Sequence, residues 1–217
     1  MPSRKQIHAA AIRAQVLRGI AGNRTPGLHF PGYFLDLMWP HPADDRARVA
    51  IADGAHCRDA DGTIDISVLA LLADSALATA ARTHIAPGAR LATLYMQMQF
   101  TGATARGDIH ADARPLGISE GGALRQMMSE ATIFADGKPV CFTNGAFAAL
   151  DPPEGVKLAP LPWQHTRSLK APLLAEHELD AHERAILKAC DAALAKISRD
   201  ASFIQNFWGG VPRRTAG

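Results

Sequence analysis

The chain of 217 residues has few cysteines, little net charge and no apolar run long enough to cross a membrane. Its three cysteines are odd in number and are spaced neither for a disulfide framework nor for a zinc site. A formal net charge of +2 is too small to indicate nucleic-acid binding. The longest apolar run, 66–81, is shorter than the roughly 20 residues of a span and is interrupted by Asp74. We therefore expect a cytoplasmic protein with no nucleic-acid partner, no membrane partner and no bound metal.

The first 33 residues contain no acidic side chain, although basic side chains are frequent there. Such a composition is compatible with an organelle transit peptide. The segment 3–6, Ser-Arg-Lys-Gln, instead has a capping-box pattern, and four apolar residues after it share one helical face: Ile7, Ala11, Ala14 and Leu17. Because hydroxyl side chains are sparse and no secretory apolar segment is present, we expect a structural helix.

The stretch 62–84 organises the rest of the chain. Residues 66–81 are apolar almost all round, which predicts a helix that is buried on most of its circumference. The polar exceptions gather on one side of that helix: Ser67, Asp74, Ser75, Thr79 and Arg82. Asp74 lies in the middle, where an ionised carboxylate is costly unless a neighbour compensates it. We therefore regard Asp74 as the candidate functional residue of the chain.

Alternating apolar and polar residues predict strands on both sides of this helix. We expect a weak strand at 33–38 and a clearer one at 46–52, then strands at 93–101, 108–114, 124–135 and 139–150. The last two flank Asp136-Gly137, the signal of a tight hairpin turn. Two strands, one long buried helix and four antiparallel strands indicate an α+β protein whose sheet wraps its central helix.

The terminal segments lie outside this core. We divide the chain into an N-terminal helix and loop at 1–32, a core domain at 33–151, and a Pro-rich link with a C-terminal helical extension at 152–217. The extension has an amphipathic helix between Leu179 and Ile197, followed by the aromatic residues Phe203, Phe207 and Trp208. These aromatic side chains either cover the open side of the core domain, line a ligand site or fill a core.

The motif at 62–76 resembles that of the PaaI-like acyl-CoA thioesterases, a family with the hotdog fold. Residues 62–69, Gly-Thr-Ile-Asp-Ile-Ser-Val-Leu, and 74–76, Asp-Ser-Ala, match without a gap a family pattern of Gly-Thr-Val-His-Gly-Gly-Val-Leu followed by Asp-Thr-Ala. Residues 100–108 and the hairpin at 136–140 are also similar to that family. The resemblance covers roughly 46–150 and implies a hotdog fold, an antiparallel sheet wrapped around a long central helix.

The resemblance also implies a site and a reaction, the hydrolysis of an acyl-CoA thioester. Asp74 takes the place of the catalytic acid, acting as base or nucleophile, and the amides of Ile66 and Ser67 take the place of the donors to the thioester oxygen. Asp59 and Thr93 fall at substrate-binding positions. No cofactor is implied, because CoA enters as part of the substrate. Hotdog domains pair, so the resemblance implies a homodimer or a dimer of dimers with sites at the interface.

The sequence departs from the family pattern at three positions. Asp65 stands where the family has His, and Ile66-Ser67 stand where it has Gly-Gly. Asp65 is first of all a helix N-cap, with a catalytic part as the second interpretation. Because these changes affect the donor end of the site, an acyl-ligand-binding hotdog protein without turnover is an alternative function.

A second alternative is a serine esterase that uses Ser119. Residues 117–121, Gly-Ile-Ser-Glu-Gly, match the nucleophile-elbow pattern, with His165, His177 and His182 downstream as candidate bases. That motif has to join a strand to a helix, whereas a β-like segment follows here. We therefore expect a hairpin loop at this place.

Overall fold

The structure is a computed structural model, and it describes residues 4–24, 29–39, 42–43, 46–85, 88–119, 125–152, 154–155 and 173–209. Its contacts divide the chain into two compact units. The first unit, which we call the helical unit, comprises Met1–Asp36, Asp53–Val68 and Thr166–Gly217. The second, which we call the sheet unit, comprises Leu37–Ala52 and Leu69–His165. The division predicted from sequence, at 32 and 151, stays a prediction.

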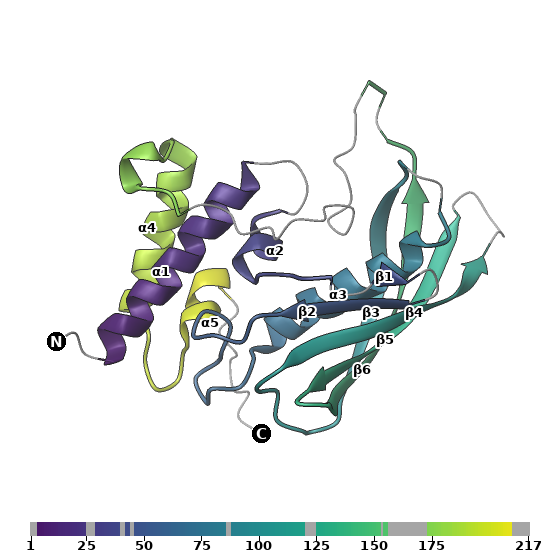
Figure 1. The fold of residues 1–217 in the computed structure, drawn as a ribbon, viewed down its shortest axis with the longest axis horizontal. Helices are drawn as coiled ribbons and strands as arrows, with labels where there is room; N and C mark the ends of the chain where they lie inside the picture. Colours follow the sequence, from purple (N-terminus) through teal and green to yellow (C-terminus); the bar gives the residue numbers. More distant parts are fainter. Residues whose placement is uncertain are drawn as a thin grey trace. The chain divides into compact units, whose positions relative to one another are not determined.

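The sheet unit contains a six-stranded antiparallel sheet (Figure 1). Its strands are β1 (Pro42–Ala43), β2 (Arg46–Ile51), β3 (Arg90–Phe100), β4 (Ile109–Ser119), β5 (Gln126–Ala135) and β6 (Lys138–Leu150). The strands lie in the order β1-β2-β4-β5-β6-β3, so β3 forms one edge although it comes third in the chain. The predicted strand at 46–52, the long helix after it and the four antiparallel strands that follow are confirmed, whereas the first strand of the sheet, β1, is not the one predicted at 33–38.

Helix α3 (Ile66–Arg82) packs on this sheet through small and branched apolar side chains. Leu72, Ala73 and Leu77 have no exposed surface. The Ser129 hydroxyl of β5 donates to the Leu77 carbonyl at 2.9 Å, and a Cβ built on Gly145 of β6 lies 3.3 Å from Leu77 Cδ1. The expected α+β arrangement, a sheet against one long apolar helix, is therefore present.

Strand β3 contains a bulge that the sequence pattern did not reveal. Thr93 pairs with Phe147 and Tyr95 pairs with Ala146, so Leu94 is the extra residue. Met96 then pairs with Gly145, which faces α3. The alternation of polar and apolar residues at 93–101 puts Thr93 and Met96 on opposite faces of a regular strand, and this expectation is wrong, because the inserted Leu94 brings both side chains to the helix side.

The hairpin between β5 and β6 has the geometry that its sequence predicts. Asp136 and Gly137 have φ values of 48° and 74°, as a type I′ turn requires. Strand β4 runs on to Ser119, beyond the predicted end at 114, with an irregularity in its pairing between Pro115 and Gly117. Pro115 is tolerated inside the strand because the ladder is already interrupted there.

The helical unit contains α1 (Arg4–Asn23), α2 (Phe30–Phe34), α4 (Ala181–Ala195) and α5 (Phe203–Trp208). The weak strand predicted at 33–38 is wrong. Pro31 lies in the first turn of α2, where a proline favours a helix start, and beyond α2 only an isolated bridge joins Met38 to Ala50.

The expected helices at both ends of the chain are present, and α1 buries part of the predicted face. Leu17 is buried as predicted, whereas Ala11 is exposed, and Ile12, Val16 and Ile20 are buried as well. The buried face of α1 is therefore shifted around the helix from the predicted one and overlaps it at Leu17. Ile12, Val16 and Ile20 follow one another at a spacing of four residues, so they form one row on the helix, and this row is the side that is buried.

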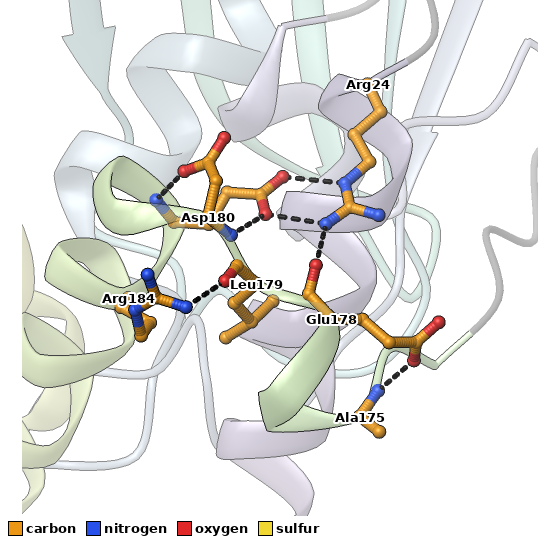
Figure 2. A network of polar contacts seen from close by, with 7 residues as sticks. Arg24, Ala175, Glu178, Leu179, Asp180 and Arg184 are labelled. Atoms are coloured by element: carbon orange, nitrogen blue, oxygen red, sulfur yellow. Dashed lines mark hydrogen bonds and ion pairs between the residues drawn. The ribbon is translucent and has the colours of Figure 1, made fainter.

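An arginine joins the end of α1 to the start of α4 (Figure 2). Arg24 donates to both carboxylate oxygens of Glu183, at 2.7 and 2.6 Å, and to the Glu178 carbonyl at 2.7 Å. Glu183 also accepts from the Asp180 amide at 2.9 Å, which completes a capping box. This pairing lowers the pKa of Glu183 to about 2. The two helices therefore share one charged cap.

Aromatic side chains form the interior of the helical unit. Phe34 of α2 contacts the rings of Phe203, Phe207 and Trp208 from α5, with centroids 5.8 to 6.4 Å apart. Phe203 has only 2% of its surface exposed. Of the roles open to the C-terminal aromatic residues, the filling of a core is the one that these contacts support.

Candidate active site

Asp74 and Thr93 meet between the middle of α3 and the edge strand β3. The Thr93 hydroxyl donates to Asp74 Oδ1 at 2.8 Å. The bulge at Leu94 makes this contact possible, because it keeps Thr93 on the helix side of β3. Asp74 is half-buried rather than buried, and Thr93 is exposed. The carboxylate is therefore compensated by a hydroxyl and stays accessible from one side.

Asp74 belongs to an accessible stripe along α3. Its neighbours on this stripe, Ser75, Ala78 and Arg82, are also half-buried, while Ala76 and Leu77 are fully buried. Asp74, Ala78 and Arg82 follow one another at an i, i+4, i+8 spacing, so they form a nearly straight row on the helix surface. The polar side predicted from the sequence is thus the side that the sheet leaves uncovered.

Trp39, which the sequence did not single out, borders this stripe. Its indole Nε1 donates to Thr79 Oγ1 at 3.0 Å, and the Thr79 hydroxyl donates to the Ser75 carbonyl at 2.7 Å. Thr79 is the one member of the predicted polar side that is buried. Trp39 precedes the strands β1 and β2, whereas Thr93 belongs to β3 at the opposite edge of the sheet. The stripe is therefore bordered by a side chain from each end of the sheet.

The other predicted site residues belong to the helical unit. Asp59 accepts from the Thr63 hydroxyl at 2.9 Å and from the Asp61 amide at 3.1 Å. Its burial, with Asp61 beside it, raises the pKa of Asp59. Within this unit Asp59 therefore orders the turn that leads to α3.

Asp65 is the N-cap of α3, as its position predicts. Its carboxylate accepts from the Ser67 amide at 2.9 Å and from the Ser67 hydroxyl at 2.5 Å, and only 4% of Asp65 is exposed. The Ser67 amide is thus already engaged, while the side chain of Ile66 is 58% exposed. In the part of the chain that the structure describes, the Ile66 amide is the one of the two predicted donors that no acceptor occupies.

His56 lies in the same loop and was not recognised from the sequence. Its ring contacts Phe34 edge to face, with centroids 5.2 Å apart, and its buried Nε2 has no hydrogen-bond partner among the residues that the structure describes. Burial lowers the pKa of His56 to about 4. A Cβ at Gly54 would lie 2.7 Å from His56 Nδ1, so glycine leaves the space that the ring occupies. In the sequence, this packing is indicated by a glycine two residues before the histidine, which leaves space for the ring.

Two other places in the chain offer less for catalysis. Ser119 pairs with Gln126 at the end of β4, and the next element described is strand β5, so the strand-to-helix elbow is missing from the described residues. A groove of about 780 Å³ lies over the sheet, but Arg48 and Arg114 in it are paired with Asp112 and Glu130, and it contains none of the predicted site residues.

Among the residues that the structure describes, no three metal-binding side chains lie close enough to hold an ion together. Within the same residues, no helix has the length and apolar character to span a membrane.

The fold is similar to that of several solved structures. One is a protein from Bacillus halodurans solved with CoA, at 14% sequence identity and a TM-score of 0.56, over 70% of this chain and 97% of that chain. Another is a thioesterase from Haemophilus influenzae, at 14% identity and a TM-score of 0.50, over 57% of this chain and 84% of that chain. The chain has a hotdog fold.

The predicted fold is therefore confirmed, and the similar structures include thioesterase-type hotdog proteins. A variant of the phenylacetic acid degradation protein PaaI from Thermus thermophilus is 27% identical, with a TM-score of 0.48, over 55% of this chain and 97% of that chain. No protein-family model and no curated protein matches the chain. In this hotdog protein α3 is the central helix.

Proposed function

We propose that this hotdog protein is an acyl-CoA thioesterase in which Asp74 acts as general base or nucleophile. The observation that carries the proposal is the 2.8 Å hydrogen bond from Thr93, which orients a carboxylate on the uncovered side of the central helix. Hydrolysis of a thioester needs such a group near the carbonyl carbon. The solved structure with CoA supports the substrate class, because it shares the fold.

The donor end of the site stays a prediction from the sequence. Negative charge develops on the thioester oxygen during attack, and amides at a helix N-terminus stabilise such charge. We assign this part to the Ile66 amide, since the Ser67 amide donates to Asp65. In this proposal Asp65 holds the first turn of α3, and Asp59 and Thr93 contact the substrate. A cytoplasmic location also stays a prediction.

We propose a homodimer that forms along β3. This strand is a sheet edge of 11 residues, and it carries Leu94, Tyr95 and Phe100 with 46 to 47% of their surface exposed. An edge with unpaired backbone groups and exposed apolar side chains favours pairing with another strand. The same edge holds Thr93, so a partner subunit there would cover the open side of Asp74.

The experiment is steady-state hydrolysis of a panel of acyl-CoA thioesters by the wild type and two variants. Asp74→Asn keeps the side-chain shape, and we expect it to lower the rate by about 10²–10⁴-fold, the usual effect of losing a positioned base. Ser119→Ala should keep the wild-type rate. Circular dichroism establishes that both variants fold. Full activity of Asp74→Asn would refute the mechanism, and an inactive Ser119→Ala would favour the serine esterase.

The second candidate is an acyl-ligand-binding protein without turnover. The engaged Ser67 amide and the Ile66 side chain at the start of α3 favour it, because both reduce the donors for a thioester oxygen. Binding of a non-hydrolysable thioether analogue of acyl-CoA, together with no hydrolysis by the wild type, would support this function over the first.

A further inference from the structure

We propose that Arg82 binds a carboxylate at the far end of the acyl group, so that the preferred substrates are CoA thioesters of dicarboxylic acids. The inference rests on the proposed function, in which Asp74 faces the thioester carbon. Both Arg82 and Asp74 belong to the sheet unit.

Arg82 is a half-buried guanidinium without a carboxylate. Its Nη1 donates to the Ala89 carbonyl at 3.1 Å, and among the described residues no acidic side chain bonds to it. Its burial lowers the pKa of Arg82, and no carboxylate counteracts this effect. Arg48 and Arg114 of the sheet unit, by contrast, each form an ion pair with a carboxylate. A guanidinium has five donors, so most of those on Arg82 remain for an anion.

Arg82 lies two helical turns from Asp74 on the same accessible stripe. Along α3, eight residues at 1.5 Å each separate them by about 12 Å. The strand gives an independent measure, because Arg82 bonds at Ala89 and Asp74 bonds at Thr93. Four residues of extended chain span about 13 Å. The carboxylate and the guanidinium therefore face the same stripe from positions on the order of 10 Å apart.

The surface between these two charges suits a short methylene chain. Ala78 lies midway in the row. Its methyl side chain leaves space beside the helix, and alanine does not lower the helix propensity as glycine would. Ser75 lies beside it, with its carbonyl already bonded to Thr79. The described residues place no charged side chain on this row between Asp74 and Arg82. An acyl chain along this row would end at the guanidinium.

The separation matches an acyl chain better than it matches CoA. A hydrogen bond at the Arg82 end and the approach of Asp74 to the thioester carbon take about 3 Å each. About 6 Å remains, which roughly five C–C bonds of an extended chain would span. By contrast, about 16 Å of extended pantetheine separates the sulfur from the first phosphate. We therefore assign the anion to the acyl end, with adipyl as the central case.

The experiment compares adipyl-CoA with hexanoyl-CoA, which has six carbons and no terminal carboxylate. For the wild type we expect kcat/KM to favour adipyl by about 10- to 100-fold, the range for a charge-assisted pair. Arg82→Gln should bring the ratio near one, and Arg82→Lys should restore part of it. A merely structural Arg82 would lower stability without changing the ratio.

Arg90→Gln is the matched control. Arg90 is also an arginine that donates to a backbone carbonyl, that of Asp151, at the start of β3, but it is exposed and lies outside the helix stripe. We expect this variant to keep the wild-type ratio. An equal change in both variants would mean that general positive charge, and not Arg82, selects the substrate, which would overturn the proposal.

Two further measurements separate the remaining outcomes. The first uses adipyl and hexanoyl thioesters of pantetheine, which lack the phosphates of CoA. If Arg82→Gln lowers kcat/KM equally for both CoA thioesters and for neither pantetheine thioester, Arg82 binds a CoA phosphate and the proposal is wrong. If no thioester is hydrolysed, the proposed function fails. Binding of the S-(5-carboxypentyl) and S-hexyl thioethers of CoA then decides the part of Arg82, because equal affinities for the wild type would overturn it.

Discussion

At the scale of single residues, the hydroxyl of Thr93 decides how Asp74 is oriented. We predict that Thr93→Val, which keeps the shape and removes the hydroxyl, lowers kcat/KM by about tenfold, since a hydrogen bond to a charged group is lost. Thr93→Ser should retain most of the activity. Steady-state kinetics on one acyl-CoA measures both. A serine variant as slow as the valine variant would show that the methyl group matters instead.

The buried ring of His56 makes the stability of the helical unit depend on pH. Its pKa is about 4 when folded, against an ordinary value of 6.5, because burial disfavours the charged ring. The unfolded chain therefore takes up this proton first as the pH falls, and the stabilisation present above pH 6.5 is lost progressively between 6.5 and 4. We predict that His56→Phe loses less stability than the wild type over this window.

Denaturant unfolding at several pH values between 7 and 4 tests the His56 prediction. The exposed His8 of α1 offers a control in the same unit, and His8→Gln should keep the wild-type dependence. Parallel curves for His56→Phe and the wild type would contradict the prediction.

At the scale of elements, one glycine allows α1 and α2 to pack together. A Cβ on Gly22 would lie 2.4 Å from the Tyr33 ring, and Tyr33 itself is buried. In an exposed helix, Gly→Ala is stabilising by about 1 kcal/mol. Here we predict the opposite sign for Gly22→Ala, a lower melting temperature of the helical unit, because the buried ring has to move. Differential scanning calorimetry measures this, and a raised melting temperature would refute it.

The bulge in β3 shows how an element also determines the site. With strict alternation, Thr93 and Met96 would lie on different faces, and Thr93 would point away from Asp74. The extra residue Leu94 brings the hydroxyl to the helix side. Gly145, opposite Met96, makes this packing close, because its Cβ would lie 3.0 Å from the Tyr95 carbonyl and 3.3 Å from Leu77.

At the scale of the whole molecule, the exposed edge strand predicts association. Light scattering of the purified chain at micromolar concentration should give at least twice 23.1 kDa. We predict that Tyr95→Lys, at the edge, shifts the protein toward monomer and lowers activity, because a charge on an edge strand opposes pairing. Activity is measured on the same fractions.

Leu116 is the matched control for this prediction. It is 46% exposed, against 47% for Tyr95, but it lies on β4, which β5 and β6 separate from β3 in the sheet. Leu116→Lys should therefore keep the wild-type mass. A wild type that is a monomer would contradict the proposed dimer along β3. A Leu116→Lys variant that dissociates as Tyr95→Lys does would contradict it as well.

The elements that could be predicted from the sequence alone are those whose formation depends on residues close together in the chain. The apolar run predicted α3, Asp65 predicted its cap, and Asp136-Gly137 predicted the β5–β6 turn. Such features rest on backbone preferences and bonds within a few residues, so a local pattern is sufficient. The register of Asp74 in α3 was enough to single it out as the candidate site residue.

What these elements contact follows from the packing of distant segments. The half-burial of Asp74, its bond to Thr93 and the burial of His56 depend on residues far apart in the sequence. The same polar side of α3 contained both Thr79, which is buried under Trp39, and Arg82, which has no carboxylate among the described residues. Periodicity places side chains on a face, but the neighbours from distant strands determine which are compensated.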